Sequence, residues 1–156
     1  MNEDTTTLVE RLQRVQSKLV APKGQVNKFG NYKYRSAEDI LEALKPLLNQ
    51  EKLALIINDE IVEIGGRVYV KASAAVVDFV GAQLSVSAYA REAEDKKGMD
   101  VSQISGSASS YARKYALNGL FCIDDTKDAD ATNTHGKSKP VTAQPRSSAP
   151  SLDELI

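Results

Sequence analysis

Three β-rich runs follow one another between residues 53 and 93, and they constrain the fold more than any other feature of the chain. Gly65 and Gly66 separate the first two runs. A glycine pair is typical of a two-residue hairpin turn, because both central residues of such a turn need positive φ. In the third run apolar and polar side chains alternate, as in a strand buried on one face. We therefore predict strands at residues 53–64, 67–79 and 83–93, with a turn near Gly81, in an antiparallel meander.

A three-stranded sheet needs a helix to cover its apolar face, and the segment after residue 100 is the obvious candidate. No acidic residue occurs from Val101 to Ile123, although an arginine and a lysine lie between two tyrosines at its centre. We predict a helix from about residue 102 to 118, with Gly119 as its end cap.

A helical wheel divides this predicted helix into two faces. We expect the face with the tyrosines to be the core face, so that these rings pack rather than stack on bases; it holds Ile104, Ala108, Tyr111 and Tyr115. The opposite face is small near its start, so a backbone or a phosphate can approach closely; it holds Gly106, Ser109, Ser110, Arg113 and Leu117. Lys114 lies to one flank.

Two further helices are predicted before the strands. Residues 5–20 have the apolar spacing of an amphipathic helix, which Pro22 and Gly24 end; its apolar positions are Leu8, Leu12, Val15 and Leu19. Ser36 and Asp39 resemble a capping box for a second helix; its buried stripe is Ile40, Leu41, Leu44, Leu47 and Leu48. Pro46 predicts a kink or an early end in that helix.

The expected fold class is therefore α+β, in the order α-α-β-β-β-α. We expect one domain over residues 1–130 and a disordered tail over residues 131–156, because the tail has few large apolar residues and holds three of the five prolines. The last six residues, Ser151 to Ile156, regain apolar and acidic side chains. They are either a docking peptide for a partner or, as we favour, a frayed terminus.

The charge distribution points to nucleic acid even though the formal net charge is only −1. Residues 21–35 are expected to be a loop. Residues 18–35 carry five basic residues and no acid, with aromatics among them, whereas residues 124–154 carry six acids. Lys33, Tyr34 and Arg35 lie just ahead of a predicted helix N-terminus, which also favours phosphate. If this segment is extended, Lys33 and Arg35 lie on one side and Tyr32 and Tyr34 on the other. Basic and aromatic side chains in such a pattern suit sequence-independent single-strand binding. A solvated basic loop is the alternative.

Enzyme motifs are missing from the sequence. It has no GxxxxGK[ST], HExxH or CxxC pattern, and it has one cysteine and one histidine, His135. We expect no enzyme activity, no cofactor and no bound metal, and Cys122 is expected to be a small buried apolar residue. The acids Asp124, Asp125, Asp128 and Asp130 are expected to solubilise the end of the fold; magnesium binding by a nuclease and pairing with a neighbouring subunit are the alternatives. No apolar stretch is long enough for a membrane helix, and we expect a cytoplasmic location.

Residues 103–125, QISGSASSYARKYALNGLFCIDD, resemble the signature of the ERF (essential recombination function) family of phage single-strand annealing proteins. The resemblance extends over roughly residues 5–130. It implies a β-β-β-α core and homo-oligomeric rings or helical filaments. It also implies a basic groove that holds one strand by its phosphates and leaves the bases exposed for pairing, without ATP. Related proteins can carry extra basic residues where this chain has Ser109 and Ser110. DNA binding by one subunit is therefore expected either to be weak or to depend on oligomerisation and on Lys71 or Arg91.

The residues expected to contact DNA come from several elements: Lys33, Tyr34, Arg35, Lys71, Arg91, Arg113 and Lys114. For Arg113 the alternative is an ion pair with a strand acid such as Asp59 or Glu63. We expect Arg113→Ala to weaken DNA binding without unfolding the chain. The expected partners are single-stranded DNA, the annealed duplex intermediate, further copies of the chain and a host single-strand-binding or recombination protein at the tail. The competing functions are a non-annealing single-strand binder, a metal-dependent nuclease and a structural oligomer.

Overall fold

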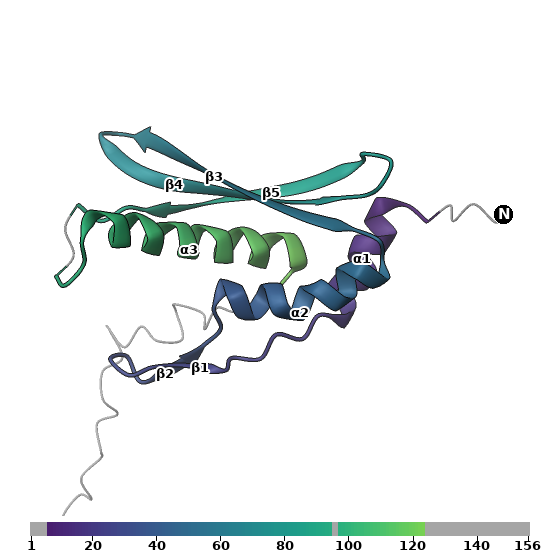
Figure 1. Ribbon diagram of the computed structural model, residues 1–156, viewed down its shortest axis with the longest axis horizontal. Helices are drawn as coiled ribbons and strands as arrows, with labels where there is room; N and C mark the ends of the chain where they lie inside the picture. Colours follow the sequence, from purple (N-terminus) through teal and green to yellow (C-terminus); the bar gives the residue numbers. More distant parts are fainter. Residues whose placement is uncertain (1–5, 95–96, 124–156) are drawn as a thin grey trace, which may run out of the picture. The chain divides into compact units, whose positions relative to one another are not determined.

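The computed structural model describes residues 6–94 and 97–123 of the chain. Its class is α+β, as predicted, with a three-stranded antiparallel sheet that packs on a long helix (Figure 1). The elements are α1 (Leu8–Lys18), β1 (Gln25–Asn27), β2 (Tyr32–Tyr34), α2 (Ala37–Gln50), β3 (Ala54–Ile64), β4 (Arg67–Val77), β5 (Gln83–Arg91) and α3 (Val101–Phe121). The predicted order is confirmed, and a short β1–β2 hairpin is added to it.

The three long strands form the predicted meander, in the order β3-β4-β5. Gly65 and Gly66 have φ of 61° and 72°, the values that a two-residue hairpin turn requires. The β3–β4 pairing is uninterrupted from Ala54 opposite Val77 to Ile64 opposite Arg67. Because successive side chains of a strand point to opposite faces, this register decides which strand residues meet α3.

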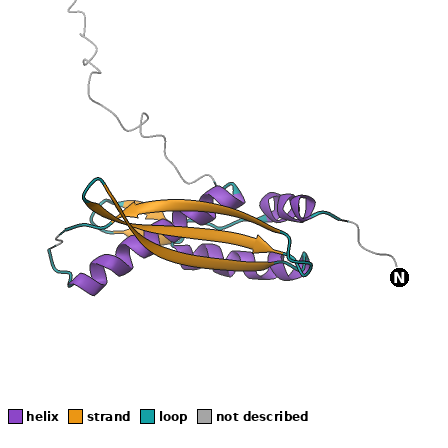
Figure 2. Ribbon diagram, turned by 90° about the horizontal axis from the view of Figure 1, so that it is seen from above, coloured by secondary structure: helices purple, strands orange, loops and turns teal. Residues whose placement is uncertain are grey.

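The core lies between the sheet and α3. Alternate residues of the central strand β4 are buried on that side: Val70, Ala72, Ala74 and Val76. Helix α3 faces them with a stripe of small residues, Ala108, Ala112 and Ala116, followed by the fully buried Leu117. Figure 1 shows α3 running along one face of the sheet, and in Figure 2 the strands lie over the helices. The alanine stripe lets the helix approach the sheet closely.

Helix α3 ends later than predicted, and Gly119 is not its cap. Gly119 lies inside the helix, where an added Cβ would come within 3.0 Å of Val86 Cγ1 on β5. The glycine is therefore a point of close approach between helix and sheet. The helix continues because Leu120 and Phe121 are buried in the core, and it ends at Cys122, whose backbone is left-handed with φ of 53°. Cys122 is exposed, so the prediction of a buried cysteine is wrong.

Both N-terminal helices begin with a capping box. The predicted box of Ser36 and Asp39 is confirmed, and Thr7 with Glu10 forms a second one at α1. Hydrogen bonds from Ser36, first of all the one from its backbone N–H, lower the pKa of Asp39. Of the two alternatives predicted at Pro46, the early end is wrong, because α2 runs on to Gln50 and buries Leu48 beyond the proline; the kink stays a prediction.

Residues 25–34 form the β1–β2 hairpin where the sequence predicted a loop. The side chain of Asn27 organises its turn: Oδ1 accepts hydrogen bonds from the backbone N–H groups of Phe29 (2.9 Å) and Gly30 (3.0 Å). Asn31 takes a left-handed backbone with φ of 49°. Such a turn arises from one asparagine side chain rather than from apolar alternation, so strand periodicity did not indicate it.

Several predictions concern residues that the structure does not describe. They are the acids Asp124, Asp125, Asp128 and Asp130, the histidine His135, the domain boundary at residue 130 and the segment Ser151 to Ile156. Within the described residues, no helix is long and apolar enough to cross a bilayer.

Candidate nucleic-acid interface

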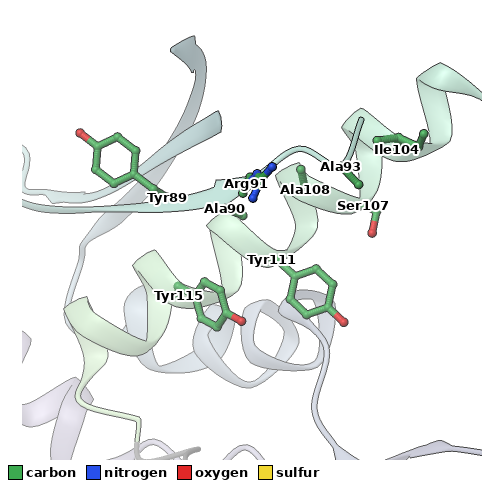
Figure 3. Close-up of a pocket in the computed structure, with 9 residues that line it drawn as sticks. All are labelled: Tyr89, Ala90, Arg91, Ala93, Ile104, Ser107, Ala108, Tyr111 and Tyr115. Carbon is green, nitrogen blue, oxygen red and sulfur yellow. The ribbon is translucent and has the colours of Figure 1, made fainter. Parts of the chain in front are cut away.

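Two grooves meet at Tyr111 on helix α3. The first, which we call the hairpin groove, lies between the β1–β2 hairpin and α3 and has a volume of about 310 Å³. Its lining is Asn27, Tyr32, Tyr34, Arg35, Ser36, Ala37, Ser110, Tyr111 and Lys114. The second, the β5 groove, lies between β5 and α3 and has a volume of about 360 Å³ (Figure 3). Its lining is Tyr89, Ala90, Arg91, Ala93, Ile104, Ser107, Ala108, Tyr111 and Tyr115.

Charge in the two grooves is of one sign. Arg35 and Lys114 line the hairpin groove and Arg91 lines the β5 groove, and none of the described residues that line either groove is acidic. Three further grooves on the described fold include glutamates. A cleft lined by one sign of charge concentrates ligands of the opposite sign. The joined grooves are therefore well suited to bind a polyanion.

Tyr111 and Tyr115 line these grooves instead of packing in the core, so the predicted core face of α3 is wrong at both positions. Their side chains are 49% and 48% exposed, and their ring centroids are 6.1 Å apart. Figure 3 shows both rings pointing away from β5. Only small side chains fit where α3 lies against the sheet, so the alanine stripe takes that side. Leu117, predicted on the face opposite the core, is fully buried.

The tyrosines of the hairpin approach those of the helix. The rings of Tyr32 and Tyr34 are 6.2 Å apart in an edge-to-face arrangement. Burial and the neighbouring tyrosines Tyr32, Tyr115 and Tyr34 raise the pKa of Tyr111. Tyr32, Tyr34 and Tyr111 line the hairpin groove together, and Tyr115 lies beside Tyr111. We call these four residues the tyrosine cluster.

Three contacts hold the hairpin tyrosines in place. The Tyr32 ring lies against Gly30, where an added Cβ would come within 2.4 Å of the ring, and Asn27 Nδ2 donates a hydrogen bond to the Tyr32 hydroxyl at 3.0 Å. The Lys114 ammonium lies 5.9 Å from the centroid of the Tyr34 ring, which is within cation–π range. Lys114 thereby links α3 to the hairpin.

Arg113 points to the sheet rather than into either groove. Its Nη2 lies 2.8 Å from Asp59 Oδ2 on β3, its Nε donates to both carboxylate oxygens, and Ser109 Oγ donates to the same carboxylate at 2.5 Å. Burial acts to raise the pKa of Asp59, but hydrogen bonds from Arg113 and Ser109 and the guanidinium charge together lower it. The alternative of an ion pair with Asp59 is confirmed. Contact of Arg113 with DNA stays a prediction.

The other predicted DNA-binding residues are divided between surfaces. Tyr34, Arg35 and Lys114 come together in the hairpin groove, and Arg91 lies in the adjoining β5 groove. Lys33 is exposed on the hairpin but lines neither groove. The alternation that paired it with Arg35 does not hold, because β2 ends at Tyr34 and Arg35 lines the groove with the tyrosines. Lys71 lies outside both grooves and pairs with Glu60 across the β3–β4 ladder, at 3.5 Å.

Sequence reasoning missed part of the site. Tyr32, Tyr111 and Tyr115 were not chosen as binding residues, and Asn27 was not recognised as the residue that shapes the hairpin. The sequence did contain a signal for Tyr111 and Tyr115. The two tyrosines are four residues apart, a spacing that places them on one helix face, and two basic residues lie between them.

A helix-covered meander, with a groove whose described lining holds tyrosines and cations but no acid, defines an α+β protein with a candidate single-strand nucleic-acid interface. In the comparison with known families, the ERF superfamily model matches residues 8–154, and the chain belongs to this family. The chain is also similar to the Essential recombination function protein of Salmonella phage P22. The two are 55% identical over 141 residues, which cover 90% of this chain and 67% of the phage protein.

Proposed function

We propose that this chain binds single-stranded DNA and anneals complementary strands without ATP during phage or prophage recombination. Membership of the ERF superfamily and the recombination role in the name of the similar phage P22 protein support the general role. The observation that carries the finer proposal is the joined hairpin and β5 grooves, where three cations and five tyrosines gather and no described lining residue is acidic.

The proposed mechanism is binding rather than covalent chemistry. Arg35, Lys114 and Arg91 neutralise phosphates of a bound strand, which reduces its repulsion from a second strand. Base pairing between complementary strands then supplies the driving force, so no nucleotide hydrolysis is needed.

We propose that the active form is a homo-oligomer, a ring or a helical filament. Three cations of one subunit neutralise only a few phosphates, and a single-strand contact of this size is weak at physiological salt. Subunits joined side by side engage one strand at many grooves, and linked weak sites reach a high combined affinity.

The test is the annealing rate of two labelled complementary oligonucleotides, without ATP, over a salt series. We expect pairing faster than in the absence of protein, and an acceleration that fades as salt rises. Arg35→Gln and Lys114→Gln should each reduce the slope of log affinity against log salt by about 0.7, because one phosphate contact is lost. Lys45→Gln is the matched control, since it removes the same charge from α2 outside both grooves.

The second candidate is a single-strand binder that protects DNA or recruits partners and does not anneal. The same grooves favour it, since a cation-lined aromatic surface binds a strand whether or not a second strand pairs with it. Strand binding without faster pairing would select this function, and no binding at low salt would exclude both.

A further inference from the structure

The tyrosine cluster has more exposed aromatic surface than packing requires. Tyr32, Tyr111 and Tyr115 are each close to half exposed, whereas the core of the same domain is complete without them. Exposed flat rings that lie together in a groove beside cations are the usual means by which proteins stack unpaired bases. A groove that used only phosphate contacts would not need the rings.

We propose that the tyrosine cluster is a base-stacking site, which takes unpaired nucleobases of a bound strand so that the strand is held by bases as well as by phosphates. This inference rests on the proposed DNA binding. It differs from the arrangement that the family resemblance implies, in which all bases are exposed.

The geometry of the cluster suits this role. Within each tyrosine pair the ring centroids are just over 6 Å apart, and Tyr111 of the helix pair lines the hairpin groove together with both hairpin tyrosines. The hairpin groove of about 310 Å³ is at the lower end of the range for small-ligand clefts, which is ~300–1,000 Å³. The sites for base and phosphate are adjacent, because Arg35 and Lys114 line the same groove as Tyr32 and Tyr34.

The hairpin rings are held in position before any ligand binds. Asn27 fixes the turn and also bonds the Tyr32 hydroxyl, Gly30 lies against the Tyr32 ring, and Lys114 lies over Tyr34. A side chain already held in its binding conformation loses less entropy when the ligand arrives. The cluster is therefore a pre-formed platform.

Stacking has a consequence for annealing. A base on a tyrosine is withheld from pairing, so a complementary strand must displace it. The site then favours the unpaired strand over the finished duplex, and the paired product leaves the tyrosine cluster as annealing proceeds.

The experiment compares two probes of equal length and equal phosphate number, oligothymidylate and an abasic oligonucleotide. The chain has six tyrosines and no tryptophan, so quenching of its tyrosine fluorescence reports stacking directly. The wild-type protein should bind oligothymidylate about 5- to 150-fold more tightly than the abasic probe, the loss expected for one stacked base.

Three variants identify the residues responsible. Tyr111→Leu with Tyr115→Leu should remove most of the preference and the quenching while leaving the salt slope unchanged. Tyr111→Phe with Tyr115→Phe keeps the rings and should keep the preference. Tyr69→Leu is the matched control, because Tyr69 lies on β4 outside both grooves. If the double leucine variant unfolds by circular dichroism, Tyr32→Leu on the exposed hairpin makes the same test.

Equal wild-type affinity for the two probes would overturn base stacking and leave DNA binding through phosphates intact. A base preference that survives both the double leucine variant and Tyr32→Leu would overturn the assignment to this cluster. Wild-type protein that binds neither probe would overturn the proposed function together with the stacking site.

Discussion

The two sides of helix α3 are built from the same chain segment but differ in almost every respect. The side toward the sheet is an alanine stripe that is fully or nearly fully buried, followed by Leu117 and by Gly119, which nearly touches Val86. The side toward the grooves has Ser110, Lys114 and two half-exposed tyrosines. The small residues thus serve close packing and the large residues serve the surface, the reverse of the usual expectation for an aromatic helix face.

The two neighbouring basic residues of this helix show the difference between its sides most clearly. Arg113 is bound to Asp59 on β3, whereas Lys114 lies over Tyr34 of the hairpin. Side chains of adjacent helical residues point about 100° apart, so two basic residues in one motif contact different partners. A basic motif on a helix therefore need not form one basic surface.

The largest expected effect compares Leu117 with Tyr115. Leu117→Ala should lower the free energy of unfolding by about 2–5 kcal/mol, because a fully buried side chain is lost and a cavity remains. Tyr115→Ala should cost less than ~1 kcal/mol, since the ring is half exposed. Urea unfolding followed by circular dichroism measures both. Equal losses would show that Tyr115 belongs to the core.

Larger side chains should have the next largest effect on stability, and only on the side of α3 that faces the sheet. Ala112→Leu should destabilise the fold by about 1–3 kcal/mol, because the alanine is fully buried against the sheet and cannot make room. Ser110→Leu adds a leucine on the exposed groove side and should change stability by ~0.5 kcal/mol or less. A neutral Ala112→Leu would mean that α3 does not pack closely on the sheet.

The two neighbouring basic residues should give smaller effects, one on stability and the other on DNA binding. Arg113→Gln should lower the free energy of unfolding by about 1 kcal/mol, because it removes a partly exposed bidentate ion pair. Lys114→Gln should change stability by ~0.5 kcal/mol or less but weaken single-strand binding. Thermal unfolding and oligonucleotide titration separate the two roles. DNA binding lost equally in both variants, with both folds intact, would make Arg113 a DNA contact as well.

Lowering the pH should remove part of the stability that the ion pair between Arg113 and Asp59 contributes. The pKa of Asp59 lies below its ordinary value of 3.8, so the unfolded chain binds this proton more tightly than the folded one. The stabilisation is therefore present above pH 3.8 and is lost as pH falls through the lower folded pKa. The stability gap between wild type and Asp59→Asn should narrow from neutral pH to about pH 3. A gap that stays constant would show that the carboxylate charge does not contribute.

Local chemistry explains what could be predicted from the sequence. The Gly65-Gly66 turn, the alternation in residues 83–93 and the capping box of Ser36 and Asp39 each depend on residues close together in the chain. They sufficed for the meander, the helices and the α+β class, and the motif at residues 103–125 sufficed for the family. The basic candidates Arg35 and Lys114 also came from sequence pattern, and both line the hairpin groove.

Only the tertiary structure decided which side of α3 meets the sheet, and the site depends on that choice. The periodicity of Ile104, Ala108, Tyr111 and Tyr115 fits a core face as well as the alanine stripe does. The distance between helix and sheet excludes the large rings from the interface. Arg113 forms its ion pair with Asp59, which is 54 residues away in the chain. The hairpin places Tyr32 and Tyr34 in the same groove as Tyr111. Such pairings arise from packing between distant segments, which no local pattern encodes.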